Sequence, residues 1–279
     1  MHEGTAVVRV PLPEGHVTVR VTGSGPDVLL IHGIPGSGHV WDRVAARLVE
    51  RNRVLVPDLV GFGDSSRSRD AERIWAGGQR DALLRVLDHL GVEQAAIVGH
   101  DFGGQVALLL SAARPHLPTH LVLAATNAFP DTPIPFPLSA VTWPLIGPVA
   151  ERIVLSGRAL SATLRLGVGR PKVRLDPEVY LADGEQRRVI RTIFATSLRG
   201  IGERYGPIEE GLASIDVPTL VLWGDRDPFF PVAQGRRIAE AITGARFAVF
   251  EGAGHFLPEE RPEAFADEVA SLITDESLR

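Results

Sequence analysis

Short apolar segments that predict buried strands alternate along this chain with segments of helical spacing. The apolar segments are bounded by glycine, proline or aspartate, as buried strands often are. They lie at Val28–Ile31, Arg53–Val56, Ala95–Val98, His120–Ala124, Thr219–Trp223 and Arg246–Phe250. The helical patterns lie at Val40–Val49, Ala71–Leu90, Gln105–Ala113, Val232–Ile242 and Pro262–Ile273. This alternation predicts an α/β fold, with a mainly parallel sheet covered by helices on both faces.

Two segments near the start of the chain have a different pattern. Ala6–Val10 and His16–Val21 alternate apolar and polar residues with a period of two. Such alternation is typical of strands with one face buried. We therefore expect an antiparallel hairpin at the edge of the sheet.

The alternation of strands and helices stops between about Phe129 and Ile215. This stretch begins with FPDTPIPFP, whose prolines exclude a helix or a central strand there, and continues with three or four short helical patterns. We expect a helical cap at residues 129–215, inserted between the two parts of one core domain at residues 1–128 and 216–279.

Composition excludes several classes of function. The formal net charge is −5 and no stripe of basic residues is found, which argues against nucleic-acid binding. The chain has no cysteine, so disulfides, thiolate metal sites and cysteine nucleophiles are excluded. No cluster has metal-ligand spacing and no glycine motif fits a dinucleotide, so no cofactor is expected. Without a leader-like or membrane-spanning segment, a cytoplasmic location and no stable membrane association are expected.

The most informative motif is VGHDFGG at residues 98–104, between a predicted strand and a predicted helix. A strand, then Gly-x-nucleophile-x-Gly, then a helix forms a sharp turn that lifts its central residue above the sheet. Gly99, Gly103 and Gly104 would avoid clashes in this turn. The central residue here is Asp101, where a serine is more usual.

Together with four further motifs, this turn resembles the α/β-hydrolases over nearly the whole chain. The motifs occur in the order typical of that family. They are HGIP at 32–35, DLVGFGDSS at 58–66, WGDRDPFFP at 223–231 and GAGHFLPEE at 252–260. The resemblance implies an eight-stranded α/β-hydrolase fold.

The resemblance also implies roles for individual residues. Asp101 would be the nucleophile, His255 the base, and Asp227 the acid that orients His255. Asp225 and Asp131 are alternatives for that acid. The backbone N–H groups of Ile34 and Phe102 would form the oxyanion hole.

We call the sharp turn around Asp101 the elbow. A carboxylate at the elbow changes the expected chemistry. Its attack on an ester would give a reactive anhydride, whereas its attack on an electrophilic sp³ carbon gives an alkyl ester of Asp101. His255 would then activate a water that hydrolyses this ester. Within the family, an aspartate nucleophile points to epoxide hydrolases, haloalkane dehalogenases and fluoroacetate dehalogenases.

The leaving group separates these classes. Haloalkane dehalogenases bind halide with N–H donors at the positions that Ile34 and Phe102 occupy, and neither side chain can donate a hydrogen bond. Fluoroacetate dehalogenases carry arginines after the nucleophile, where this chain has Phe102 and Gln105. An epoxide needs a proton donor such as tyrosine, and both tyrosines of the chain, Tyr205 and Tyr180, fall in the predicted cap.

Epoxide hydrolysis to a vicinal diol is therefore the leading prediction, with a small hydrophobic substrate. We expect Trp143, in the predicted cap, and Pro35 to contact this substrate, and Trp143 is also a candidate halide donor. Dehalogenation stays an alternative. So do a hydrolase-fold protein that only binds or isomerises its ligand, and a serine-type hydrolase with an altered elbow.

Overall fold

Eight strands form a single sheet in the order β1-β2-β4-β3-β5-β6-β7-β8. The computed structural model describes residues 4–132, 136, 138–154, 156–170, 173–175, 180 and 184–275. The strands are β1 (Ala6–Pro11), β2 (His16–Thr22), β3 (Asp27–Ile31), β4 (Arg53–Pro57), β5 (Ala95–His100), β6 (Pro118–Ala124), β7 (Thr219–Gly224) and β8 (Arg246–Phe250). All eight predicted strands are thus present, with ends that differ by a residue or two.

The sheet is parallel except at one edge. β1 pairs antiparallel with β2, which in turn pairs antiparallel with β4. The pairs from β4 through β3, β5, β6 and β7 to β8 are all parallel. The predicted edge hairpin is confirmed. Every residue of β5 and β7 is buried, because helices cover both faces of the central strands.

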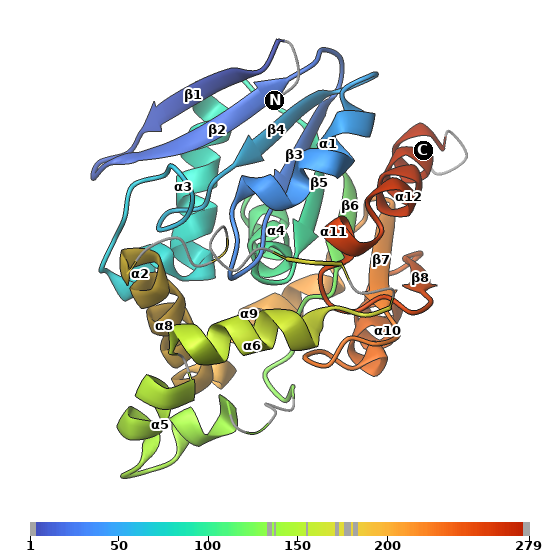
Figure 1. Cartoon of the computed structure of the whole chain (residues 1–279). Helices are drawn as coiled ribbons and strands as arrows, with labels where there is room; N and C mark the ends of the chain where they lie inside the picture. Colours follow the sequence, from blue (N-terminus) through green and yellow to red (C-terminus); the bar gives the residue numbers. More distant parts are fainter. Residues whose placement is uncertain are drawn as a thin grey trace.

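The core helices surround this sheet (Figure 1). They are η1 (Gly38–Trp41), α1 (Asp42–Leu48), α2 (Ala71–Ile74), α3 (Ala76–His89), α4 (Phe102–Ala113), α10 (Val232–Ala241), α11 (Leu257–Glu260) and α12 (Pro262–Thr274). α1 packs against α12, and α3 packs against α4. The fold class predicted from the alternating pattern is confirmed.

One predicted core helix is wrong in detail. The pattern over Ala71–Leu90 predicts one helix, but the chain is extended at Trp75, with φ −69° and ψ 162°, and α2 and α3 are separate. The indole of Trp75 is buried against the rings of Phe102 and Tyr205, 5.8 and 5.7 Å between centroids. Burial of this large side chain outweighs the local preference for an unbroken helix.

Further helices lie between β6 and β7. They are η2 (Leu138–Thr142), α5 (Gly147–Val154), α6 (Gly157–Gly167), α8 (Gly184–Arg199) and α9 (Ile201–Leu212), and we call them the inserted helices. Figure 1 shows α5, α6, α8 and α9 gathered at one end of the sheet. The domain boundaries at 128/129 and 215/216 stay predictions.

Arg237 of α10 contacts the chain near both ends of the inserted helices. Its guanidinium forms ion pairs with Asp131 and Glu209, at 2.5 and 2.9 Å. The same guanidinium stacks on the ring of Phe129, 3.7 Å from the centroid. One core side chain therefore links the segment that enters the insertion with α9, the last inserted helix.

Among the described residues, no helix is both long and apolar enough to cross a membrane.

Candidate active site

Asp101 lies at the sharp turn between β5 and α4, in a backbone conformation that is rare for a residue with a side chain. Its φ is 52° and its ψ −122°. The backbone segments pack so closely at this turn that neither glycine leaves room for a side chain. A Cβ atom on Gly103 would lie 2.2 Å from the carbonyl oxygen of Ile31, and a Cβ atom on Gly99 would lie 2.5 Å from the carbonyl oxygen of Gly103. The two glycines therefore let the elbow fold tightly over the end of β3.

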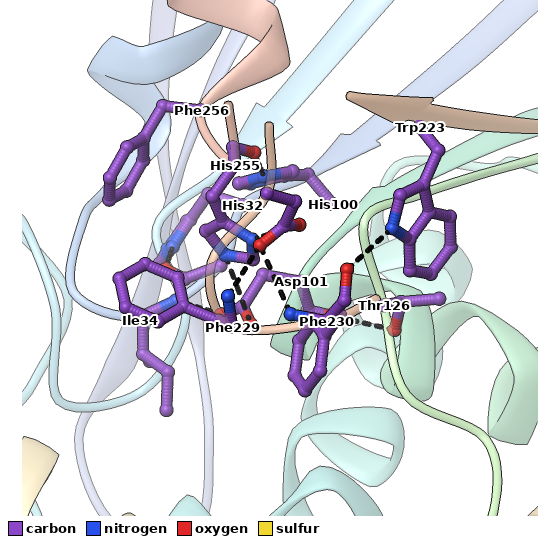
Figure 2. Close-up of polar contacts among 12 residues, drawn as sticks. His32, Ile34, His100, Asp101, Thr126, Trp223, Phe229, Phe230, His255 and Phe256 are labelled. Carbon is purple, nitrogen blue, oxygen red and sulfur yellow. Dashed lines mark hydrogen bonds and ion pairs between the residues drawn. The ribbon is translucent and has the colours of Figure 1, made fainter. Parts of the chain in front are cut away.

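The two carboxylate oxygens of Asp101 have different partners (Figure 2). Oδ2 accepts a hydrogen bond of 2.8 Å from the backbone N–H of Ile34, in the HGIP loop. Oδ1 faces Nε2 of His255 at 3.5 Å. The predicted donor Phe102 is the first residue of α4, but its N–H forms no hydrogen bond with this carboxylate in the described structure.

His255 lies between two aspartates. Its Nδ1 is 2.9 Å from Oδ2 of Asp227, and its Nε2 faces Asp101. Oδ1 of Asp227 accepts backbone N–H bonds from Phe229 and Phe230, at 2.8 and 3.0 Å, so this carboxylate is fixed in a tight turn after β7. The structure therefore brings together, from three separate loops, the three side chains that the motifs single out.

The charges of these groups depend on one another. Burial on its own would lower the pKa of His255, but the negative charges and hydrogen bonds of Asp227 and Asp101 outweigh burial and raise it to about 10. Burial would likewise raise the pKa of Asp101, but the hydrogen bond and positive charge of His255 lower it below its usual value. The pair is accordingly an imidazolium beside a carboxylate at neutral pH.

His100, the residue before the elbow, supports the loop that carries His255. Its Nε2 donates a hydrogen bond of 2.8 Å to the backbone carbonyl of His255. Burial and the neighbouring positive charge of His255 lower the pKa of His100 to about 4, so this imidazole is neutral. The rings of Phe229, Phe230 and Phe256 lie 5.1 to 5.6 Å from the His255 ring and form an apolar wall around it.

The two alternative acids do not contact His255. Asp225 accepts a hydrogen bond from the backbone N–H of Gly252 at 2.7 Å, which ties the loop after β8 to the loop after β7. Asp131 is largely exposed and pairs with Arg237. Of the three candidate acids, Asp227 alone is hydrogen-bonded to the histidine.

Tyr205, on α9, is buried close to the elbow. Its ring contacts Trp75, which in turn contacts Phe102. Burial and the negative charge of Asp101 raise the pKa of the Tyr205 phenol, while hydrogen bonds with Asn127, Gln105 and Ser197 act in the opposite direction. The Asp101 charge thus acts on this phenol, although the described residues show no hydrogen bond between the two.

Tyr180 lies on the other flank of the nucleophile, beside the HGIP loop. Its ring packs edge-on against His39 and Phe256, at 5.0 and 5.9 Å. Together with Ile34 and Pro35 it lines a small cavity of about 10 Å³. The Tyr180 hydroxyl is buried without a hydrogen-bond partner among the described residues. Pro35 and Tyr180 therefore line the same cavity, and the predicted contact of Pro35 with substrate stays a prediction.

Trp143 lies largely exposed on the inserted helices, and its predicted contact with substrate stays a prediction. This side chain is 48% exposed and packs against Phe136, 6.5 Å between ring centroids, beside α5. The apolar sequence around it predicts pocket lining, but the surrounding residues Leu145 and Ile146 are exposed as well. Trp143 belongs to an outer surface of the inserted helices.

Two residues that the sequence did not single out support the site. Thr126, just after β6, donates a hydrogen bond of 2.6 Å to the backbone carbonyl of Asp101. Glu260 accepts backbone N–H bonds from Gly254 and Phe256, on either side of His255, and from Gly169 after α6. Its place five residues after the motif histidine, at the end of GAGHFLPEE, is the sequence signal that could have marked Glu260.

Within the described part of the chain, no group of three or more His, Asp or Glu side chains could hold a metal ion. The arrangement can supply a carboxylate nucleophile, a histidine that exchanges protons, and one backbone N–H donor to an oxyanion.

Comparisons with known proteins identify the family to which this fold belongs. Residues 26–262 match the family model of the alpha/beta hydrolase fold. An uncharacterized protein of Mycobacterium tuberculosis (strain H37Rv) is 33% identical over 274 residues, covering 91% of this chain and 77% of the relative.

Two solved structures share the fold at lower identity. A haloalkane dehalogenase from Bradyrhizobium elkani has a TM-score of 0.81 at 21% identity, covering 96% of this chain and 99% of its own. An epoxide hydrolase, CorEH, has a TM-score of 0.79 at 21% identity, covering 99% and 100%.

Proposed function

Because this chain belongs to the alpha/beta hydrolase fold family, we propose that it is a hydrolase in which Asp101 attacks an sp³ carbon. On the chemistry of the site we assign the substrate as an epoxide, and the product as a vicinal diol. The observation that carries the proposal is that the two oxygens of the Asp101 carboxylate have different partners. Oδ2 is bound by the Ile34 N–H, and Oδ1 is left to react.

In the first step, Oδ1 forms a bond to one epoxide carbon and the C–O bond of the ring breaks. The oxygen that leaves takes a proton from a phenol, which we assign to Tyr205. The result is an alkyl ester of Asp101 with a neighbouring hydroxyl group. A raised phenol pKa is no obstacle, because an alkoxide is a much stronger base than a phenolate.

Formation of the ester changes the charge of the site. The negative charge of Asp101 disappears, and with it part of the interaction that keeps His255 protonated. The extra proton of His255 can then restore the Tyr205 phenol. The imidazole becomes neutral at the stage of the reaction that needs a base.

In the second step, neutral His255 takes a proton from a water molecule while the oxygen of that water attacks Cγ of Asp101. The N–H of Ile34 stabilises the negative charge that develops on Oδ2. Collapse of this intermediate breaks the ester bond, and the departing oxygen takes the proton from His255 to give the diol. The protonated Asp101 finally returns its proton to His255, which restores the starting pair.

The position of Trp143 favours an epoxide over a halide. The largely exposed indole of Trp143 supplies no buried halide donor, and Ile34 and Phe102 offer no side-chain donor. The inserted helices instead bring the phenol of Tyr205 close enough for the Asp101 charge to affect it.

The test uses His255→Gln, which removes the base of the second step. Incubated with styrene oxide, this variant should accumulate a covalent adduct with the mass of the epoxide, on a peptide that contains Asp101. Asp101→Asn with His255→Gln is the matched control and should give no adduct.

Absence of an adduct over a panel of epoxides and haloalkanes would contradict the covalent mechanism and favour a binding or isomerising protein. An adduct from a haloalkane with release of halide, but none from any epoxide, would instead assign the chain to dehalogenation. Solvent labelled with heavy oxygen should label Asp101 before the diol in a single turnover of the unmodified enzyme.

A further inference from the structure

Six large apolar side chains are exposed together around η2 and α5. Phe136 and Trp143 are in ring contact, and the following turn exposes Leu145 almost completely, at 97%. We call the six residues the apolar patch. They are Phe136, Trp143, Leu145, Ile146, Val149 and Ile153. Figure 1 shows α5 at the far end of the inserted helices, away from the sheet.

The patch lies on one side of a short amphipathic segment. The N–H of Ala150 bonds to the carbonyl of Ile146 at 2.9 Å, so the helical turn includes Ile146. Ile146, Val149 and Ile153 are three and four residues apart and share a face. Glu151 points to the opposite face, where it pairs with Arg199 of α8 at 2.8 Å. The Glu151 side of α5 therefore faces α8, and the apolar side faces away from this contact.

The stretch of sequence that carries the patch and α6 has a net positive charge. Between residues 136 and 169 the sequence has three arginines, Arg152, Arg158 and Arg165, and one acid, Glu151. The acid is neutralised by Arg199, whereas the three arginines are exposed and have no ion pair with any described residue. Exposed apolar side chains with tryptophan, beside unpaired arginines, are the composition of helices that bind at a lipid surface.

We propose that the apolar patch docks this protein on the surface of a membrane that contains anionic lipids. Trp143 and its apolar neighbours would enter the boundary between head groups and acyl chains, and the arginines would contact lipid phosphates. A second copy of the chain fits less well, because two facing patches would bring two sets of unpaired arginines together. The proposal replaces the expectation from the sequence that the protein does not associate with membranes.

The test uses the full chain with vesicles of phosphatidylcholine alone or mixed with phosphatidylglycerol. The protein should sediment with the mixed vesicles, and its tryptophan emission should shift to the blue. Trp143 is the one exposed indole among the four tryptophans, since Trp41, Trp75 and Trp223 are buried. Trp143→Phe should therefore abolish the shift while the protein still sediments.

Two further variants test the apolar and charged parts of the surface. Leu145→Asn with Ile153→Ser should reduce the vesicle-bound fraction about tenfold or more, as expected for loss of two buried aliphatic side chains. The matched control is Val7→Asn with Val249→Ser, which removes exposed apolar residues from β1 and β8 and should leave binding unchanged. Substitution of all three arginines by glutamine should remove the preference for mixed vesicles.

Three results would overturn the proposal. The protein could stay in the supernatant with both kinds of vesicle, or the patch variant could bind as well as the control. A concentration-dependent dimer that the patch variant abolishes would show that a second copy occupies the surface. Circular dichroism and the unfolding midpoint verify that each variant is folded.

Discussion

Nε2 of His255 lies 3.5 Å from Oδ1 of Asp101, and both side chains are buried. At neutral pH this contact joins a positive to a negative group, because each lowers the free energy of the charged form of the other. In the proposed mechanism, the resting site is therefore ready for attack by the carboxylate and not for activation of water.

The first prediction concerns the charge of His255. Its pKa should be near 10 in the folded protein and should fall in Asp101→Asn, which removes a negative neighbour. NMR titration of the imidazole measures both values. Since the folded pKa exceeds the ordinary value of 6.5, protonation contributes its full stability below about pH 6.5, and this contribution is lost as the pH rises toward 10. The unmodified protein should thus lose more stability between about pH 7 and pH 9 than His255→Gln does.

The second prediction concerns Asp227. Asp227→Asn should leave formation of the ester largely intact but slow its hydrolysis by about 10² to 10⁴, because His255 loses the carboxylate that orients and stabilises it. Rapid quenching followed by mass spectrometry measures the two steps separately. Asp225→Asn is the matched control, since Asp225 contacts Gly252 and not the histidine. Equal effects of the two substitutions would rule out the role proposed for Asp227.

The third prediction compares the two tyrosines. Tyr205→Phe should slow ring opening of an epoxide by about 10² or more, because the developing alkoxide loses its proton donor. Tyr180→Phe should have a smaller effect, since the charge of Asp101 acts on the Tyr205 phenol, whereas the Tyr180 hydroxyl is buried without a hydrogen-bond partner among the described residues. Single-turnover rates with styrene oxide decide the order. The reverse order would assign the proton to Tyr180.

The fourth prediction concerns the elbow. Gly103→Ala should destabilise the fold by at least about 2 kcal/mol, because the new Cβ atom would lie 2.2 Å from the backbone oxygen of Ile31. Gly202→Ala, on α9, meets no atom within 4 Å and should stabilise the protein by about 0.5 to 1 kcal/mol. Urea unfolding midpoints measure both. A neutral effect of Gly103→Ala would show that the elbow is looser than described.

The fifth prediction compares two adjacent acids. Glu260→Gln should destabilise the fold by about 1 to 3 kcal/mol. The carboxylate of Glu260 accepts hydrogen bonds from three backbone N–H groups, and the amide nitrogen of glutamine would face one or more of these donors without accepting from them. Glu259→Gln should change stability little near pH 7, because burial and the charge of Asp42 raise the pKa of Glu259 to about 8 and leave it mainly neutral. Thermal unfolding near pH 7 tests the contrast.

Local patterns in the sequence predict most of the core. β5 and β7 are buried throughout and mostly apolar because both faces are covered, and the glycines around Asp101 indicate the elbow directly. Contacts between distant segments are harder to predict. The break at Trp75 depends on Phe102 and Tyr205, far away in the sequence, and no local pattern indicates it.

The inserted helices show the same limit. Trp143 and the buried tyrosines occur in similarly apolar surroundings, so composition does not reveal which side chains face outward. Glu151 of α5 pairs with Arg199 of α8, and a contact between two different helices is not visible in a local pattern. Glu260 likewise gains its role from Gly169, 91 residues earlier in the chain.

The loop that carries His255 is hydrogen-bonded to the end of α6. The N–H of His255 donates to the carbonyl of Gly167 at 2.7 Å, and Glu260 holds Gly169 and Gly254 at once. The elbow, by contrast, is fixed by β3 and β6 of the rigid sheet. In the proposed mechanism, a displacement of α6 on substrate entry would thus reach the base His255 more directly than the nucleophile Asp101, so ligand size would govern how long the covalent adduct persists more than how fast it forms.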